Sequence, residues 1–151
     1  MIEIIDYSDD YANDFKQLNL DWLNKYNVAE DYDIQLINDP RSKVLDKGGY
    51  IYLAKTEDKI VGTAGLANEG DSIFELIKMA VAPSFQGKGI GKMLMEKCLN
   101  KARALKATKV FLYSNSQLTT AISLYRKYGF MHVDASNSPL LTADIKMELA
   151  L

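Results

Sequence analysis

The sequence predicts a single mixed α/β domain, with a twisted sheet of about six to seven strands flanked by about four helices. Three observations predict it. Short runs rich in strand-forming residues alternate with stretches of helical periodicity along the chain. Two of those runs, 50–54 and 60–66, are separated by a tight turn and form a hairpin. A third run, 73–81, leads through a glycine-rich loop into a helix, and 151 residues suit one domain covering 1–151.

The N-terminal third begins with a loosely alternating strand at 2–7. Ser8 followed by two aspartates is a typical helix N-cap with acids in the first turn. Apolar residues at three- and four-residue spacing then extend a helix to about Tyr26. A second short helix is expected from about Glu30 to Asn38, where the Asp39-Pro40 pair ends it.

The remaining elements follow from the same signals. We expect a loop at 65–72 and the strand 73–81 after it. Gly129 lies where a helix C′ glycine is expected. The other predicted elements are a helix at 90–105, a strand at 109–113, a helix at 118–128, a strand at 130–133, a loop at 134–142 and a final strand at 145–149.

Composition excludes several classes of protein. A net charge of −2 and a pI of about 5.4 give no sign of a surface for nucleic acid or anionic membrane. The single cysteine, Cys98, excludes an intrachain disulfide and a zinc cluster; it lies on an apolar helix face, so burial is expected over a reactive thiol. His132 has no second histidine to form a metal site with, so no metal is expected. No apolar run approaches the length of a membrane span, which makes a cytoplasmic location the default expectation.

The segment between the strand 73–81 and the helix 90–105 carries the clearest functional signal. Gly87, Gly89 and Gly91 let the backbone approach a ligand closely. The loop opens a helix, whose free N–H groups and positive dipole end suit a phosphate. The alternative is a glycine-rich turn that only caps an ordinary helix.

The spacing of the glycines distinguishes between the phosphate-containing ligands that such a loop could bind. A dinucleotide fingerprint counted from Gly89 needs a glycine where Leu94 stands, and a P-loop needs Ser or Thr where Met93 follows Lys92. Neither nucleotide motif is present. What remains is Gln86-x-x-Gly89-x-Gly91, preceded by Val81-Ala-Pro.

This pattern resembles the acyl-CoA pyrophosphate loop of the GNAT (GCN5-related N-acetyltransferase) superfamily. A second segment, Ala121-Ile-Ser-Leu-Tyr-Arg-Lys-Tyr-Gly-Phe130, is similar to the A-I-x-L-Y-x-K-x-G-F segment of that superfamily. The resemblance covers the chain from about residue 50 to its end, and the order of elements is that of the GNAT fold. It implies an acetyl-CoA-dependent N-acetyltransferase similar to small bacterial members, acting on a primary amine of a small molecule or protein. The alternative is a catalytically silent acyl-CoA-binding regulatory module.

Glu75 is the candidate general base. An amine with a pKa near 10.4 must lose a proton before it attacks a thioester. In a regular strand Glu75 shares one face with the apolar residues Ile73, Ile77, Met79 and Val81. Desolvation among these neighbours would raise the pKa of its carboxyl. Its spacing from Val81 matches the base of the histone-acetylating branch of the superfamily. The alternative is a carboxylate bonded to its own sheet or solvated.

Tyr125 is the candidate acid for the departing thiolate, because a phenol is neutral at pH 7 and the superfamily commonly places such a tyrosine in this segment. The alternative is a core aromatic, since Tyr125 also lies on an apolar helix face.

The resemblance also implies the cofactor contacts. The backbone at 79–81 (Met79, Ala80 and Val81) should pair with the pantetheine amides. The backbone amides near Met79 should polarise the carbonyl group of the acetyl thioester. The N–H groups of Gln86, Gly87, Lys88, Gly89, Ile90, Gly91 and Lys92 should hold the pyrophosphate, with added charge from the Lys88 and Lys92 side chains. Many members carry an Asn where Leu118 stands here, so Asn115 is the candidate substitute, or else a turn-forming residue.

The N-terminal helices are where GNAT enzymes usually form the acceptor pocket. Trp22, Tyr26 and Glu30 are the candidates there, and the acids of this region would favour a cationic amine; the alternative is a solvated helix face. A homodimer is possible, because strands at sheet edges often pair in this superfamily.

Overall fold

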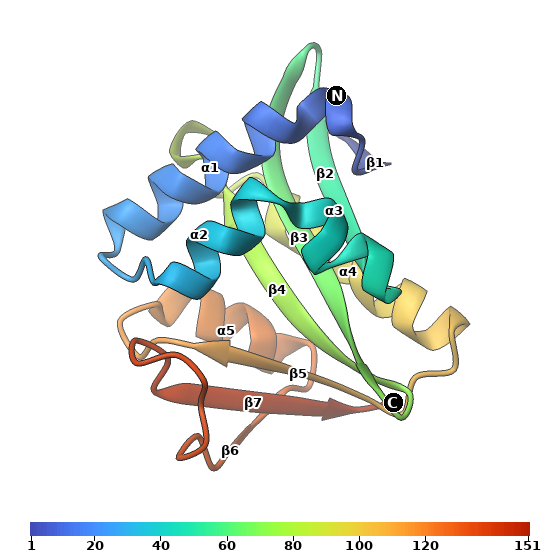
Figure 1. The fold of residues 1–151 in the computed structure, drawn as a ribbon, viewed down its shortest axis with the longest axis vertical. Helices are drawn as coiled ribbons and strands as arrows, with labels where there is room; N and C mark the ends of the chain where they lie inside the picture. The colour runs from blue at the N-terminus through green and yellow to red at the C-terminus, as the bar shows by residue number, and fades with distance from the viewer.

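The computed structural model describes all 151 residues and has one seven-stranded sheet in the order β1-β2-β3-β4-β5-β7-β6 (Figure 1). Its strands are β1 (Glu3–Asp6), β2 (Tyr50–Thr56), β3 (Lys59–Gly70), β4 (Ile73–Val81), β5 (Lys109–Ser114), β6 (Met131–Val133) and β7 (Ile145–Ala150). Its α-helices are α1 (Ala12–Lys25), α2 (Asp31–Asn38), α3 (Pro40–Lys43), α4 (Ile90–Ala104) and α5 (Thr119–Lys127). The predicted mixed α/β fold is confirmed.

Local signals explain most of the element ends. The Ser8 hydroxyl accepts a hydrogen bond from the Asp10 N–H (3.2 Å) and starts a 3₁₀ turn that continues into α1. The helix α2 ends at Asn38, as predicted, but Asp39 then caps the short helix α3, with Pro40 in its first turn. This helix was not expected.

One predicted loop is wrong. Residues 65–72 were expected to form a loop, whereas β3 continues to Gly70 and pairs with the start of β4. The polar residues Asn68 and Glu69 gave no strand signal, and it is the pairing of Asn68 with Phe74 that holds them in the sheet.

Helices cover both faces of the sheet. Figure 1 shows α1, α2 and α3 on one side and α4 on the other. The larger core, which includes Leu94 and Cys98 of α4 and Tyr125 of α5, packs on the α4 side. The smaller core, which includes Phe15 of α1 and Leu36 of α2, packs on the opposite side. Cys98 is fully buried, as predicted, and burial raises the pKa of its thiol to about 12.

A β-bulge in β4 reverses the side-chain alternation and corrects the predicted face of Glu75. Lys78 adopts a left-handed conformation (φ 52°), and the pairing with β3 shifts at this point. Before the bulge, Ile77 packs with the α1/α2 core, and Glu75 is paired with Ala67, which packs there too. After it, Met79 and Val81 pack with the α4 core. Glu75 therefore lies on the face opposite Met79 and Val81, because one extra residue separates them.

The strands β4 and β5 separate after a short parallel contact. Their pairing covers only Ile73–Glu75 with Lys109–Phe111, so β4 has no strand partner on that side from residue 76 onward. None of the helices has the length and apolar character needed to cross a lipid bilayer.

Candidate active site

Two cavities meet beside the unpaired part of β4. The larger, of about 640 Å³, lies along the glycine loop, the start of α4 and α5. The smaller, of about 120 Å³, lies between β4, β5 and the N-terminal helices. Trp22, Met79 and Leu118 line both, so the two cavities adjoin at the point where β4 has lost its partner strand.

The larger cavity is shaped by the glycine loop. Gly87 and Gly89 have positive φ angles of 78° and 81°, which side chains with a Cβ rarely adopt. The Gln86 side chain donates a hydrogen bond to the Val81 carbonyl (3.1 Å) and fixes the loop to the end of β4. Gly89 is the N-cap of α4, so the free N–H groups of the first turn of this helix border the cavity.

The charge of the larger cavity suits an anion. It is lined by Lys92 and Lys127 and by no aspartate or glutamate. A helix N-terminus, two lysines and no carboxylate together fit the pyrophosphate of a CoA-type ligand. The same cavity is also lined by Met79, Ala80 and Val81, whose backbone was predicted to contact the pantetheine.

Sequence reasoning missed one wall of this cavity, which α5 provides. Thr120, Ser123 and Lys127 line it from a helix whose Tyr125 faces the core. Their three- and four-residue spacing on a single helix face was the available signal.

Two predicted cofactor contacts lie elsewhere. The Lys88 side chain does not line the cavity, and its ammonium lies over the Phe85 ring, 5.2 Å from the centroid. Asn115 lines the smaller cavity, where its side-chain oxygen accepts a hydrogen bond from the Gln117 N–H (3.0 Å) and its amide donates to the Thr142 carbonyl. The first is the bond of a turn-forming Asn, which was the alternative for this residue, and the second ties this turn to the loop before β7.

Glu75 lies in the smaller cavity and makes no hydrogen bond or ion pair within the protein. Burial, and secondarily the charge of Glu69, raise the pKa of its carboxyl to about 7, although Lys78 and Lys146 oppose the shift. The desolvation argument thus holds, although the apolar neighbours differ from those expected. A carboxyl with this pKa exchanges protons readily near neutral pH.

Tyr125 lines the same cavity, and its ring packs edge-on against Phe130 with centroids 6.0 Å apart. Burial raises the pKa of its phenol to about 12, so the hydroxyl keeps its proton at neutral pH. The residue is 7% exposed, and its hydroxyl makes no hydrogen bond within the protein; because no fully buried side-chain oxygen lacks a partner, this hydroxyl reaches the cavity surface. The ring is a core aromatic, and its hydroxyl remains available to a ligand.

A buried ion pair beside Glu75 was not predicted. The Lys78 ammonium contacts the Asp33 carboxylate, with 12% and 4% of the side chains exposed. Asp33 also accepts a hydrogen bond from the Glu30 N–H (3.1 Å) at the start of α2. No local signal pairs residues 45 positions apart, and the bulge is what turns Lys78 toward α2.

The predicted acceptor residues take three different positions. Trp22 lines both cavities, while Tyr26 lines the larger one with its ring 5.0 Å from that of Trp22. Glu30 lines neither. Its carboxylate accepts hydrogen bonds from the N–H groups of Leu141 (3.1 Å) and Thr142 (2.8 Å), so it holds the loop before β7 instead of facing an acceptor.

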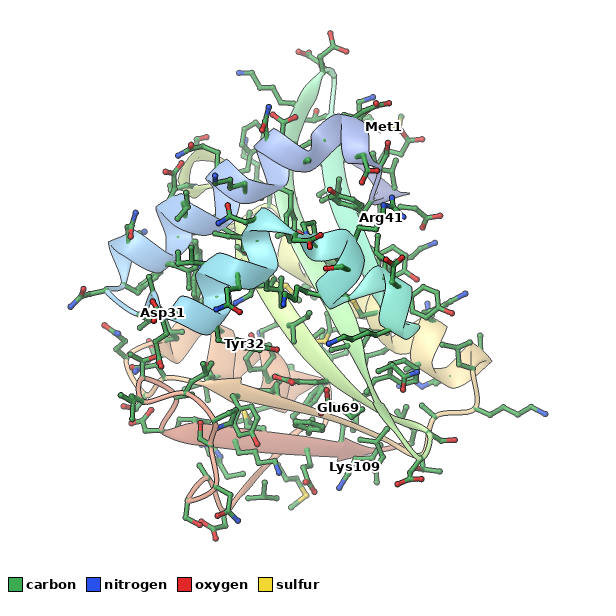
Figure 2. All side chains as sticks on the ribbon, viewed as in Figure 1. Met1, Asp31, Tyr32, Arg41, Glu69 and Lys109 are labelled. Carbon is green, nitrogen blue, oxygen red and sulfur yellow. The ribbon has the colours of Figure 1, made fainter.

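No group of three or more His, Cys, Asp or Glu side chains is placed to hold a metal ion. Figure 2 shows Tyr32 near the start of α2, between this helix and β5 in that view, and this tyrosine also lines the smaller cavity.

A family model for the acetyltransferase (GNAT) family matches residues 12–130. The chain therefore belongs to the GNAT acetyltransferase family. Solved structures agree with this fold. A GNAT-family acetyltransferase of Staphylococcus aureus superimposes with a TM-score of 0.91 at 24% identity over 100% of this chain and 99% of that one. The PaiA N-acetyltransferase of Thermoplasma acidophilum, in complex with coenzyme A, does so with a TM-score of 0.79 at 20% identity over 100% and 99%.

The chain is also similar in sequence to curated proteins. It is 32% identical over 102 residues to the uncharacterized N-acetyltransferase YvbK of Bacillus subtilis, covering 66% of each chain. It is 35% identical over 95 residues to human N-acetylaspartate synthetase, covering 62% of this chain and 32% of that protein. The matched region thus spans less than two thirds of these relatives.

Proposed function

We propose that this chain is an acetyl-CoA-dependent N-acetyltransferase that transfers an acetyl group directly to a primary amine. The observation that carries the proposal is the meeting of two unlike cavities at Met79. One has the glycine loop, lysines and no carboxylate, and the other holds Glu75 and Tyr125. Family membership, relatives named as N-acetyltransferases and a structural neighbour in complex with coenzyme A support it.

The larger cavity is the donor site in this proposal. The N–H groups at the start of α4, with Lys92 and Lys127, bind the pyrophosphate, and the unpaired edge of β4 offers backbone groups to the pantetheine. Acetyl-CoA supplies the acetyl thioester. Trp22 and Leu118, which line both cavities, enclose the passage beside Met79.

Glu75 and Tyr125 divide the proton transfers. Glu75 takes one proton from the substrate ammonium, which leaves a neutral nitrogen with a free electron pair. That nitrogen bonds to the acetyl carbon as the carbon–sulfur bond breaks, and it gives up a second proton. Tyr125 donates a proton to the departing sulfur and is itself reprotonated by the second amine proton, directly or through water. The products are an amide and a free thiol, and no covalent enzyme intermediate forms.

Binding of the donor is tested by the melting temperature with and without acetyl-CoA, with ATP as the control nucleotide. Ligand at about 100 times its dissociation constant adds roughly 2.7 kcal/mol, which raises the melting temperature of a domain this size by about 5–10 °C. A rise with acetyl-CoA and none with ATP supports the donor site. No rise at millimolar acetyl-CoA contradicts it.

Transfer is tested by thiol release from acetyl-CoA in the presence of primary amines. Amine-dependent release with stoichiometric amide product is the expected result. Binding of acetyl-CoA without release for any amine would instead identify a silent acyl-CoA-binding regulatory module.

A further inference from the structure

We propose that the acceptor is a compact primary amine with an apolar body and no carboxylate or phosphate group. This inference rests on the proposed acetyl transfer and concerns its acceptor cavity, the smaller of the two.

The charges of the acceptor cavity leave no cation for an acidic substrate. Of the residues that line it, only Lys78 is cationic, and Asp33 neutralises it in a buried ion pair. Lys146, whose charge reaches Glu75, is not among the lining residues. Its ammonium lies over the rings of Phe111 (5.0 Å) and Tyr113 (5.6 Å). A carboxylate brought into this cavity would be desolvated without a partner.

The same cavity suits the positive head of an amine. Glu75 is its one carboxylate without an ion-pair partner. Four aromatic side chains line the cavity together with Glu75: Trp22, Tyr32, Tyr113 and Tyr125. The faces of such rings attract ammonium groups that have lost their water.

The remaining walls favour an apolar body of limited size. Most of the lining is hydrophobic and comes from the N-terminal helices, from β4 and from the C-terminal part of the chain, as in Leu23, Ile77, Met79, Leu118, Leu140 and Ala143. With a volume of about 120 Å³, the cavity has room for a small amine. Hydrogen bonds from Leu141 and Thr142 to Glu30 hold the loop that contributes Leu140 and Ala143, so this wall is fixed to the start of α2.

The first test compares amines that differ in one group. Butylamine and 4-aminobutanoate share a four-carbon chain, and 2-phenylethylamine and phenylalanine share an aromatic body. We expect kcat/KM of the wild-type protein, measured by thiol release, to be on the order of 100-fold higher for the member of each pair that lacks a carboxylate. Equal values, or preference for the member with a carboxylate, would overturn the inference while leaving the proposed transfer intact.

The second test releases the paired lysine. Asp33→Asn removes the negative partner of Lys78 while keeping the side-chain size, so the cavity gains an unpaired cation. We expect the ratio of kcat/KM for 4-aminobutanoate to that for butylamine to rise about 10-fold or more. Asp31→Asn, which changes an exposed residue of the same helix, should leave the ratio unchanged. An unchanged ratio in folded Asp33→Asn protein would overturn the role given to the ion pair.

Failures of the two proposals are distinguishable. Turnover of none of the four amines would overturn the acceptor assignment, and the separate melting measurement with acetyl-CoA then shows whether the donor site stands. Since the wild-type comparison needs no variant, a poorly folded Asp33→Asn protein does not remove the test.

Discussion

Replacing Glu75 with Gln should slow acetyl transfer and stabilise the protein at the same time. The substitution keeps the size of the side chain and removes its charge. Loss of a general base lowers kcat/KM by about 10²–10⁴-fold. The wild-type profile should rise up to about pH 7, where Glu75 ionises, and then level off until the substrate ammonium titrates near pH 10. The variant should show no break near pH 7 and should keep rising toward pH 10, because it depends on amine that is already neutral.

The effect on stability follows from the raised pKa. Below pH 4.5 the carboxyl carries a proton in both the folded and the unfolded chain, so it contributes no difference. Between pH 4.5 and about 7 the unfolded chain releases the proton while the folded chain keeps it, so stability falls as pH rises. At 1.36 kcal/mol per pKa unit the upper limit of the cost above pH 7 is about 3 kcal/mol. Glu75→Gln should therefore melt about 5–10 °C above wild type at pH 8 and level with it at pH 4.

The assay combines thiol-release kinetics from pH 6 to 10 with melting curves at pH 4 and pH 8. Glu3→Gln, on the exposed edge strand β1, is the matched control and should change neither measurement. If the Glu75→Gln protein turned over at wild-type rates across the whole pH range, the assignment of Glu75 as the base would be refuted. A melting difference between Glu75→Gln and wild type that is the same at pH 4 and pH 8 would refute the desolvation argument.

Four other outcomes follow from the geometry. Tyr125→Phe should lower kcat about 10²-fold with little change in melting temperature, because its hydroxyl has no partner within the protein; an unchanged kcat would speak against its role as an acid. Gly89→Ala forces a side chain into a left-handed conformation and should destabilise the protein by about 1–2 kcal/mol and weaken acetyl-CoA binding, as measured by denaturant unfolding and titration calorimetry. Lys127→Met should raise the dissociation constant of acetyl-CoA about 5-fold and reduce its salt dependence, whereas Lys16→Met on α1 should change neither. Glu30→Gln should lose stability above pH 4.5 and converge with wild type in acid, because hydrogen bonds hold the pKa of the Glu30 carboxyl below its usual value; parallel melting curves at all pH values would contradict this.

The donor half of the site was largely predictable from sequence. The strand, the glycine loop and the helix that form it are consecutive in the chain, so the spacing from Val81 to Lys92 carries the arrangement. Lys127 escaped prediction because its contribution depends on how α5 packs beside the loop. Lys88, by contrast, was predicted to add charge to the pyrophosphate site, whereas its ammonium lies over the Phe85 ring.

The acceptor half was less predictable, because it joins segments from both ends of the chain. Glu75 and Tyr125, which both line this cavity, were predicted from residue type and motif. The Lys78–Asp33 pair and the bond from Asn115 to Thr142 link positions that no local pattern connects. Glu30 was expected at the acceptor for its charge, and the fold gives it a different partner.

By itself the sequence determined the α/β class, the order of elements, the burial of Cys98 and the glycine loop, since these depend on periodicity and on the backbone preferences of single residues. Only the tertiary structure decided the face of Glu75. The bulge at Lys78 inserts one residue into the pairing of β4 with β3, and because strand side chains alternate with a period of two, it reverses every position after it. The separation of β4 from β5 likewise arises from packing, and it is this opening that brings the two cavities together.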